Sequence, residues 1–219
     1  MKRPVDLRAR DIEASRLSMG QRVREIRKAR GWTLADLATR AGLAVSTISK
    51  VERGALSPTY DRFSMLARGL GMDIGELFSP QADPFHAGSV NLTRRGQARR
   101  HETPTYIYDM HAADLAGKRM TPMSGRIKAH DRADFDQLLS HPGEEFLYLL
   151  SGQLHVHLHG SEPVTLEAGD SLYFDSALGH AYVSAGPQDA EILVVCWSPD
   201  RFKRGYPLPP KRKRGAKLA

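Results

Sequence analysis

Hydrophobic residues recur at helical spacing in the first third of the chain and at alternate positions further on. Between residues 18 and 78 apolar side chains return every three or four positions, which predicts short amphipathic helices. From residue 105 the period changes to two, which predicts half-buried strands. The pattern therefore predicts an all-α domain followed by an all-β domain.

The segment 34–54, LADLATRAGLAVSTISKVERG, has the spacing of two short helices joined by a tight turn. The first helix has one apolar face, made by Leu34, Leu37, Ala38 and Ala41. Gly42 follows, where a turn with positive φ favours glycine. In the second helix we expect Val45, Ile48 and Val51 to point to the core. The outward side chains, Ser46, Thr47, Ser49 and Lys50, are short, polar or basic, which suits contacts with base edges and phosphates.

Three further helices are expected around this pair, which makes a five-helix bundle. Ser18 and Gln21 form a capping-box pattern at the start of the first helix, and Gly31 ends it. Its inward residues are Met19, Val23 and Ile26; its outward residues are Arg22, Arg24, Arg27, Lys28 and Arg30. Thr33 caps the second helix with Asp36 as its partner. Pro58 suits the first turn of a fourth helix with the apolar face Phe63, Leu66, Ala67 and Leu70, and Ile74, Leu77 and Phe78 make a fifth.

The string RVREIRKARGWTLADLATRAGLAVSTISKVERGALSPTYDRFSMLARGLGMDIGELF resembles the XRE (Cro/lambda-repressor-like) helix-turn-helix family over residues 20–78. The resemblance implies a DNA-binding domain that recognises a palindromic operator as a homodimer. It implies base contacts from Ser46, Thr47 and Lys50. Backbone contacts or local bracing are implied for Gln21, Thr33 and Arg53, whereas Ser49 either contacts DNA or simply faces solvent.

The second domain is predicted to be a small antiparallel barrel or jelly roll. Strands are expected at residues 106–108, 145–150, 153–158, 171–174 and 192–197. Residues 80–104 contain several prolines and glycines and are predicted to be a linker, with one early strand near 89–93. His155, His157 and His159 alternate with apolar residues and are expected to face outward.

Two motifs resemble the cupin superfamily, whose fold is the double-stranded β-helix, over residues 105–198. HPGEEFLYLLSG matches the first motif from His141 onward, and GDSLYFDSALGHAYVS matches the second, with His180 at the metal-ligand position. Leu139 stands where metal-binding cupins usually have their first histidine. His141, Glu145 and His180 are left as candidate ligands of a divalent metal ion. Alternatively, these groups line a ligand pocket without a metal.

Charge is distributed unevenly along the 219 residues, whose net charge is +7. Residues 1–80 carry 15 basic and 9 acidic side chains, residues 105–200 carry 5 and 14, and residues 201–219 carry 8 and none. A polyanion is therefore attracted to the ends of the chain and repelled by its middle. Arg126 and Lys128 form a basic pair in the acidic domain that is a candidate contact for an anionic effector.

The chain has no apolar run long enough to cross a membrane, and its N-terminus does not resemble a signal peptide. Its single cysteine, Cys196, excludes an intramolecular disulfide, fits a reducing cytoplasm and lies in an apolar run that predicts burial. The expected organisation is a basic arm (1–17), a helix-turn-helix domain (18–79), a linker (80–104), a cupin domain (105–200) and a basic tail (201–219).

Together these features predict a transcription regulator, typical of a bacterial one-component repressor, and not an enzyme. Its expected partners are double-stranded operator DNA, a small-molecule effector and a second copy of the chain. No association with a membrane is expected. One alternative is a cupin metalloenzyme, an oxygenase or isomerase, fused to a DNA-binding domain. Another is an antitoxin-like DNA-binding partner of a second protein, which leaves the β-domain without a purpose.

Overall fold

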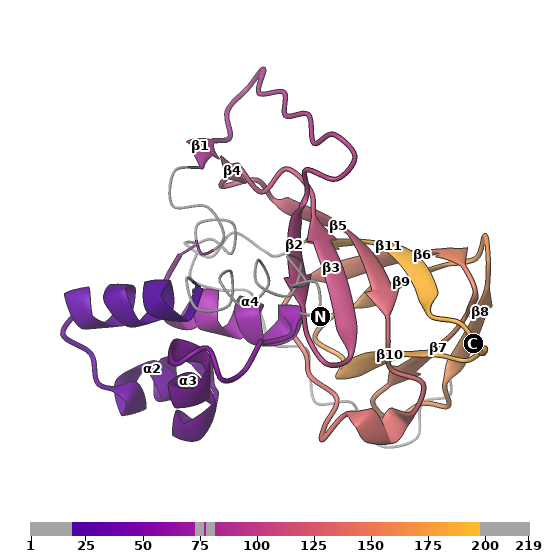
Figure 1. Cartoon of the computed structure of the whole chain (residues 1–219), viewed down its shortest axis with the longest axis horizontal. Helices are drawn as coiled ribbons and strands as arrows, with labels where there is room; N and C mark the ends of the chain where they lie inside the picture. The colour runs from indigo at the N-terminus through magenta and orange to yellow at the C-terminus, as the bar shows by residue number, and fades with distance from the viewer. Residues whose placement is uncertain (1–18, 73–76, 78–81, 198–219) are drawn as a thin grey trace, which may run out of the picture.

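The computed structural model describes residues 19–72, 77 and 82–197. Within them the N-terminal domain has four α-helices (Figure 1). The first extends from residue 19, where the description begins, to residue 29. The other three are α2 (Leu34–Ala41), α3 (Val45–Glu52) and α4 (Tyr60–Gly69). Their apolar faces pack into one core, in which the largest fully buried side chains are Leu37, Ile48, Phe63, Leu66 and Leu70.

The turn around α2 forms as its residues predict. Thr33 caps the helix, because its Oγ1 accepts a hydrogen bond from the Asp36 backbone N–H and its own N–H donates to the Asp36 carboxylate. Gly42 ends the helix in the left-handed conformation, with φ at 67°. A β-carbon on Gly69 would lie 2.8 Å from Ala41, so α2 and α4 approach each other closely.

Two predicted side-chain orientations in these helices are wrong. Arg27 is buried instead of outward, since it lies four residues after Val23 on the inward face and pairs there with buried Glu52. Val45 is 46% exposed instead of buried, because it is the first residue of α3 and lies beyond the inward face of that helix. Helical spacing therefore predicts which side chains face the core less accurately in the first and last turns of a helix.

The N-terminal domain shows four helices in the described residues instead of the predicted five. The fifth falls on residues 73–81, of which only Leu77 is described; it is helical and buried. Ser18, the predicted arm 1–17 and the predicted tail 201–219 lie outside the described residues. Pro58 precedes α4 instead of entering its first turn, because Thr59 is the N-cap. No helix in the described ranges is both long and apolar enough to cross a membrane.

The second domain is built from three β-sheets in the described residues. The six-stranded sheet has the order β2-β3-β5-β11-β6-β9, the three-stranded sheet β10-β7-β8, and β1 pairs with β4. The strands are β1 (Asp83–Pro84), β2 (Arg99–Glu102), β3 (Tyr106–Met110), β4 (Leu115–Ala116), β5 (Met120–Ile127), β6 (Glu144–Ser151), β7 (Gln153–Leu158), β8 (Val164–Glu167), β9 (Ser171–Asp175), β10 (His180–Ser184) and β11 (Ala190–Trp197). All pairs in the two larger sheets are antiparallel.

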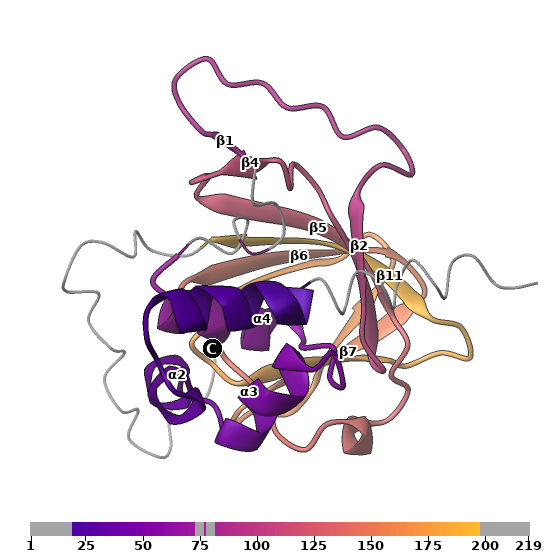
Figure 2. The same ribbon diagram turned by 60° about the vertical axis from the view of Figure 1, so that its left-hand side comes forward.

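The two larger sheets face each other across a shared apolar interior (Figure 2). In β7 the alternation is regular: Leu154, Val156 and Leu158 are buried, and the histidines between and after them face outward, as expected. Buried leucine, isoleucine and valine residues of β6 and β11 fill the interior from the opposite sheet. This β-rich arrangement is consistent with a cupin.

The five predicted strands are present as β3, β6, β7, β9 and β11, with small differences in their bounds. No strand forms at residues 89–93, where an early one was expected; the chain there has no regular structure. Two short strands, β1 and β2, lie instead in the segment 80–104 that is predicted to be a linker. The six-stranded sheet therefore begins before residue 105.

The N-terminal end of α4 lies against the edge strand β2, so the two domains are in contact (Figure 1). The Ser57 hydroxyl donates a 2.6 Å hydrogen bond to the Glu102 carbonyl, and the His101 ring Nε2 lies 2.7 Å from the Pro58 carbonyl oxygen. Phe63 packs edge-on against His101, with ring centroids 4.6 Å apart. These contacts bring the first turn of α4 to the interior of the β-domain.

Candidate functional site

The outward face of α3 carries most of the side chains that are predicted to contact DNA. Ser46, Ser49, Lys50 and Arg53 follow one another at helical spacing and so share a face. Ser46, Lys50 and Arg53 are exposed, and Ser49 is half-buried. The exposed side chain of Val45 stands at the start of the same helix. The sequence pattern missed this residue because it assigned Val45 to the core.

Three other predicted DNA contacts lie around that helix. Thr47 on α3 is half-buried and Gln21 on the first helix is exposed. The Thr33 hydroxyl is engaged in the cap of α2, where it both accepts from the Asp36 N–H and donates to the Asp36 carboxylate. The hydrogen bonds from Thr33 lower the pKa of Asp36 and keep it ionised. Of the two predicted roles of Thr33, a DNA backbone contact or local bracing, the structure shows the bracing role, as the cap of α2.

A second cluster lies inside the β-domain, where the structure brings together His141, Glu145 and His180. His141 precedes β6, Glu145 is the second residue of β6, and His180 begins β10. His141 Nε2 lies 3.1 Å from Glu145 Oε2, and His180 Nε2 lies 3.6 Å from the same oxygen. All three side chains are buried. Residues from both cupin-like motifs thus converge on one point.

The ionisation of this cluster leaves a buried carboxylate at its centre. Burial alone would raise the pKa of Glu145, but the hydrogen bond from His141 and the charge of His180 lower it to about 2. Glu145 is therefore a carboxylate, and the Tyr182 hydroxyl donates a hydrogen bond to its second oxygen. His180 Nδ1 lies 2.8 Å from the Leu178 carbonyl, which can only accept. In the neutral ring, Nε2 consequently has its lone pair directed at the cluster.

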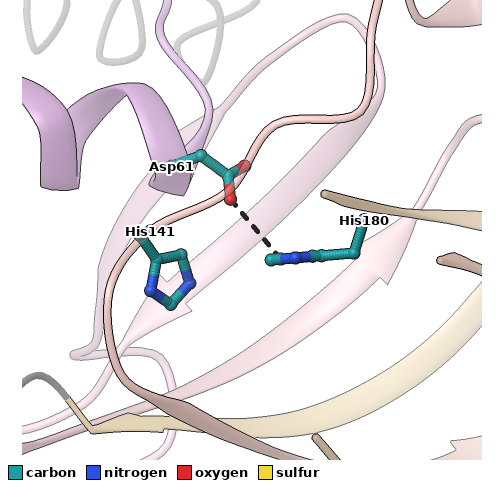
Figure 3. Close-up of side chains that lie close together, drawn as sticks. All are labelled: Asp61, His141 and His180. Carbon is teal, nitrogen blue, oxygen red and sulfur yellow. Dashed lines mark ion pairs between the residues drawn. The ribbon is translucent and has the colours of Figure 1, made fainter. Parts of the chain in front are cut away.

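Asp61, from the first turn of α4, is a fourth member that the sequence pattern missed. Its Oδ1 lies 3.4 Å from His180 Nε2, and one ligand atom from each of Asp61, His141 and His180 lies within 4.8 Å of the others (Figure 3). Nothing in the sequence marks it, because an acidic residue in the first turn of a helix is normally explained by the helix dipole.

Cys196 on β11 also belongs to the cluster, with its sulfur close to His141 and Glu145. Burial, together with the charge of Glu145, raises the pKa of its thiol well above the usual value. The predicted burial is confirmed, and the side chain lies where the apolar core meets the polar cluster. Its sulfur is a further candidate ligand atom, together with His141 and Glu145.

A small cavity adjoins the cluster. It has a volume of about 20 Å³ and is lined by Tyr60 and Asp61 from the N-terminal domain and by β-domain residues that include Tyr106, Glu145 and His180. A cavity needs roughly 10–15 Å³ to hold a water molecule, so this one has room for a single water or ion. With α4 in place, an organic ligand of metabolite size does not fit.

The cluster fits a divalent cation on its donor atoms. Two imidazoles and carboxylate oxygens suit zinc, iron or manganese. Metal–ligand bonds of about 2.0–2.2 Å place neighbouring ligand atoms roughly 3.0–3.6 Å apart, which includes the 3.4 and 3.6 Å that separate His180 Nε2 from Asp61 Oδ1 and Glu145 Oε2. Two atoms of the cluster, Asp61 Oδ1 and His141 Nδ1, are buried without a hydrogen-bond partner in the described part of the chain.

Arg126 and Lys128 do not join this cluster. Both lie on the outer face of the six-stranded sheet, at and just after the end of β5. Arg126 Nη2 lies 3.4 Å from Glu191 Oε1, and Lys128 Nζ lies 2.7 Å from Glu102 Oε1. Arg126 borders a groove of about 190 Å³ that also contains acidic side chains. The mixed charge of that groove gives no particular preference for an anion.

The fold and these two surfaces define a class of protein: a helical DNA-binding domain joined to a β-domain that encloses a polar cluster. Comparison with family models agrees, since the helix-turn-helix model matches residues 23–77 and the cupin-domain model matches residues 132–196. The chain therefore combines a helix-turn-helix domain with a cupin domain.

Individual relatives cover different parts of the chain. An uncharacterized HTH-type transcriptional regulator of Mycobacterium tuberculosis is 39% identical over 61 residues, which is 28% of this chain and about a quarter (24%) of that protein. The HTH-type transcriptional regulator PuuR of Escherichia coli is 26% identical over 188 residues, 78% of this chain and 90% of PuuR. The crystal structure of an HTH_3 family transcriptional regulator from Vibrio cholerae shares the fold, with a TM-score of 0.59, 18% identity, and 86% and 99% of the two chains covered.

An enzyme also resembles the chain. The (S)-2-hydroxypropylphosphonic acid epoxidase of Streptomyces wedmorensis is 23% identical over 170 residues, which is 74% of this chain and 86% of the epoxidase. Proteins that align with about three quarters of the chain therefore include both a regulator and an enzyme. The choice between a regulator and an enzyme therefore rests on the outward face of α3 and on the polar cluster of the β-domain.

Proposed function

We propose that the protein is a transcription regulator, a repressor of the bacterial cytoplasm, that binds a two-fold symmetric operator as a homodimer. The observation that carries this proposal is the polar and basic face of α3, exposed while the opposite face of the helix is buried in the core. Such a helix fits the major groove, and a dimer would place two of them about 34–36 Å apart.

The β-domain is proposed to be the sensory half of the same regulator. His141, Glu145 and His180 would hold a divalent cation. The effector would be that cation or, in an arrangement in which α4 has moved away from the cluster, a small molecule that binds to it. When bound, the cation supplies a positive charge and open coordination positions for an oxygen or nitrogen donor. The contacts between α4 and β2 support communication with the DNA-binding domain.

The DNA-binding half is tested with Lys50→Ala on a fluorescent duplex from the promoter region of the protein's own gene. A base contact from one side chain is worth about 1–3 kcal/mol, so we expect affinity to fall by roughly tenfold. Discrimination against a scrambled duplex should fall by a similar factor. Fluorescence anisotropy at fixed ionic strength measures both quantities.

Lys28→Ala is the matched control, because Lys28 is an exposed lysine of the same domain on the first helix. It removes the same charge away from α3 and should leave the preference for the promoter duplex unchanged. If Lys50→Ala and Lys28→Ala weaken both duplexes equally, Lys50 contributes only general electrostatic attraction. The proposed role of the α3 face would then be wrong.

A metal-dependent enzyme is the second candidate, favoured by the similarity to the epoxidase and by a cluster of two imidazoles and a carboxylate. The small cavity argues against it, because a substrate has little room while α4 covers the cluster. Turnover of (S)-2-hydroxypropylphosphonic acid by the iron-loaded protein would support this candidate. Binding of promoter DNA without turnover supports the regulator.

A further inference from the structure

We propose that Asp61 of the DNA-binding domain is a direct ligand of the cation held by the cupin domain. The cation would then bond to both domains at once and hold α4 against the β-domain. This inference rests on the proposed cation site and deepens it, since it adds a ligand from outside the cupin motifs. Figure 3 shows the Asp61 carboxylate on α4 directed at the ring of His180.

The position of Asp61 is fixed by its neighbours on both sides. Before it, the residues that lead into α4 form hydrogen bonds to β2, and after it Phe63 packs on the ring of His101. Tyr60 packs edge-on against His141, with ring centroids 5.2 Å apart. Asp61 itself is only 9% exposed. A carboxylate of the DNA-binding domain is therefore enclosed among the side chains of the cupin cluster.

Hydrogen bonding does not account for this carboxylate. Its Oδ1 has no hydrogen-bond partner among the described residues, although it is fully buried. The 3.4 Å separation from His180 Nε2 is longer than the usual 2.7–3.2 Å of an N–H···O hydrogen bond. A buried carboxylate oxygen without a hydrogen bond is strongly unfavourable unless a positive charge lies next to it, and either a protonated His180 or a bound cation would supply that charge.

A cation between the side chains resolves this arrangement. The Nε2 atom of His180 is close to two carboxylates, at 3.4 Å from Asp61 and 3.6 Å from Glu145. Both separations are those of neighbouring ligands around one metal ion, at roughly 3.0–3.6 Å. The adjoining cavity accepts an ion and excludes a larger ligand. Within the described residues, ligand atoms of Asp61, His141 and His180 lie within 4.8 Å of one another, so the donor set that includes Asp61 is two imidazoles and one carboxylate from three segments of the chain.

A ligand on α4 has a consequence for DNA binding. Because α4 packs closely on α2, at the contact of Gly69 with Ala41, the position of α4 determines where the helix-turn-helix pair lies relative to the β-domain. A cation that bonds to Asp61 stabilises the docked arrangement. If the operator favours a different arrangement, cation and DNA weaken each other's binding by the same factor.

The test is a titration of the full-length, metal-free protein with Co²⁺, whose visible absorption reports both affinity and coordination. Asp61→Asn keeps the shape of the side chain and removes the charged ligand. Changes in residues that only support metal ligands weaken binding 10–100-fold, so we expect the loss of a ligand to weaken Co²⁺ binding at least tenfold and to alter the absorption spectrum. Asp136→Asn, at an exposed carboxylate of the β-domain, is the matched control and should change neither.

A second measurement uses only the unaltered protein. Hydrogen exchange of the α4 amides should slow when Co²⁺ is added, because the cation holds α4 on the β-domain. Unchanged exchange in α4, or equal Co²⁺ affinity and spectrum in wild type and Asp61→Asn, would overturn the role of Asp61 and leave a cation site within the cupin. Failure of the wild type to bind Co²⁺ would overturn the proposed cation site itself, and the bridge with it.

Discussion

The buried ion pair between Arg27 and Glu52 should be one of the strongest determinants of stability in the DNA-binding domain. Arg27 Nε and Nη2 contact the two Glu52 oxygens at 2.6 and 2.8 Å, and the side chains are only 10% and 5% exposed. Removal of one partner from a buried pair costs about 3–5 kcal/mol, because the other charge is left without compensation. Arg27 would still donate to the Trp32 carbonyl at 2.7 Å, so we expect a loss of about 3 kcal/mol for Glu52→Ala.

Urea titration followed by circular dichroism at 222 nm measures this loss, since that signal reports the helical domain. Glu25→Ala, at an exposed position of the first helix, is the control and should change the free energy of unfolding by less than about 0.5 kcal/mol. The double variant Arg27→Met with Glu52→Leu should recover most of the stability, because no buried charge remains. A loss below about 1 kcal/mol for Glu52→Ala would refute the reasoning, since the pair would then behave like one in water.

Two further predictions concern the close helix contact and the polar cluster. Gly69→Ala should lower the free energy of unfolding of the helical domain by about 1–3 kcal/mol, because the added methyl group meets Ala41 at 2.8 Å. Urea titration measures this free energy. An unchanged value would show that α2 and α4 can separate freely. Because the pKa of Glu145 falls from 4.5 to about 2 on folding, the stability it contributes is complete above pH 4.5 and is lost as the pH falls towards 2. The difference in thermal stability between wild type and Glu145→Gln should therefore narrow from pH 6 to pH 3, and a constant difference would contradict the pKa.

Periodicity predicted the parts of the fold in which one side of an element is apolar and the other polar. The strand 153–158 is correct at both ends because Leu154, Val156 and Leu158 alternate with histidines. By contrast, β10 was missed because all five of its residues, from His180 to Ser184, are buried and the sequence shows no alternation. Both domains could be assigned from the sequence, but β10, which has no polar side, could not.

The candidate site was predictable only within the cupin motifs. His141, Glu145 and His180 stand at motif positions, and the structure brings them together. Asp61 lies about eighty residues before the nearest of them, and its place depends on how α4 docks on the β-domain. Arg27 escaped prediction for a related reason, since a basic residue is assigned to the surface unless its buried partner is known. Long-range contacts of this kind leave no local pattern.

The docking of α4 also has a consequence for solubility. Strand β2 is an edge of the six-stranded sheet, and an uncovered edge offers backbone groups to strands of other molecules. Here the Ser57 hydroxyl donates a hydrogen bond to the Glu102 carbonyl at that edge. The DNA-binding domain therefore covers the Glu102 end of this edge, and any state in which α4 leaves the β-domain makes that end available for pairing with another strand.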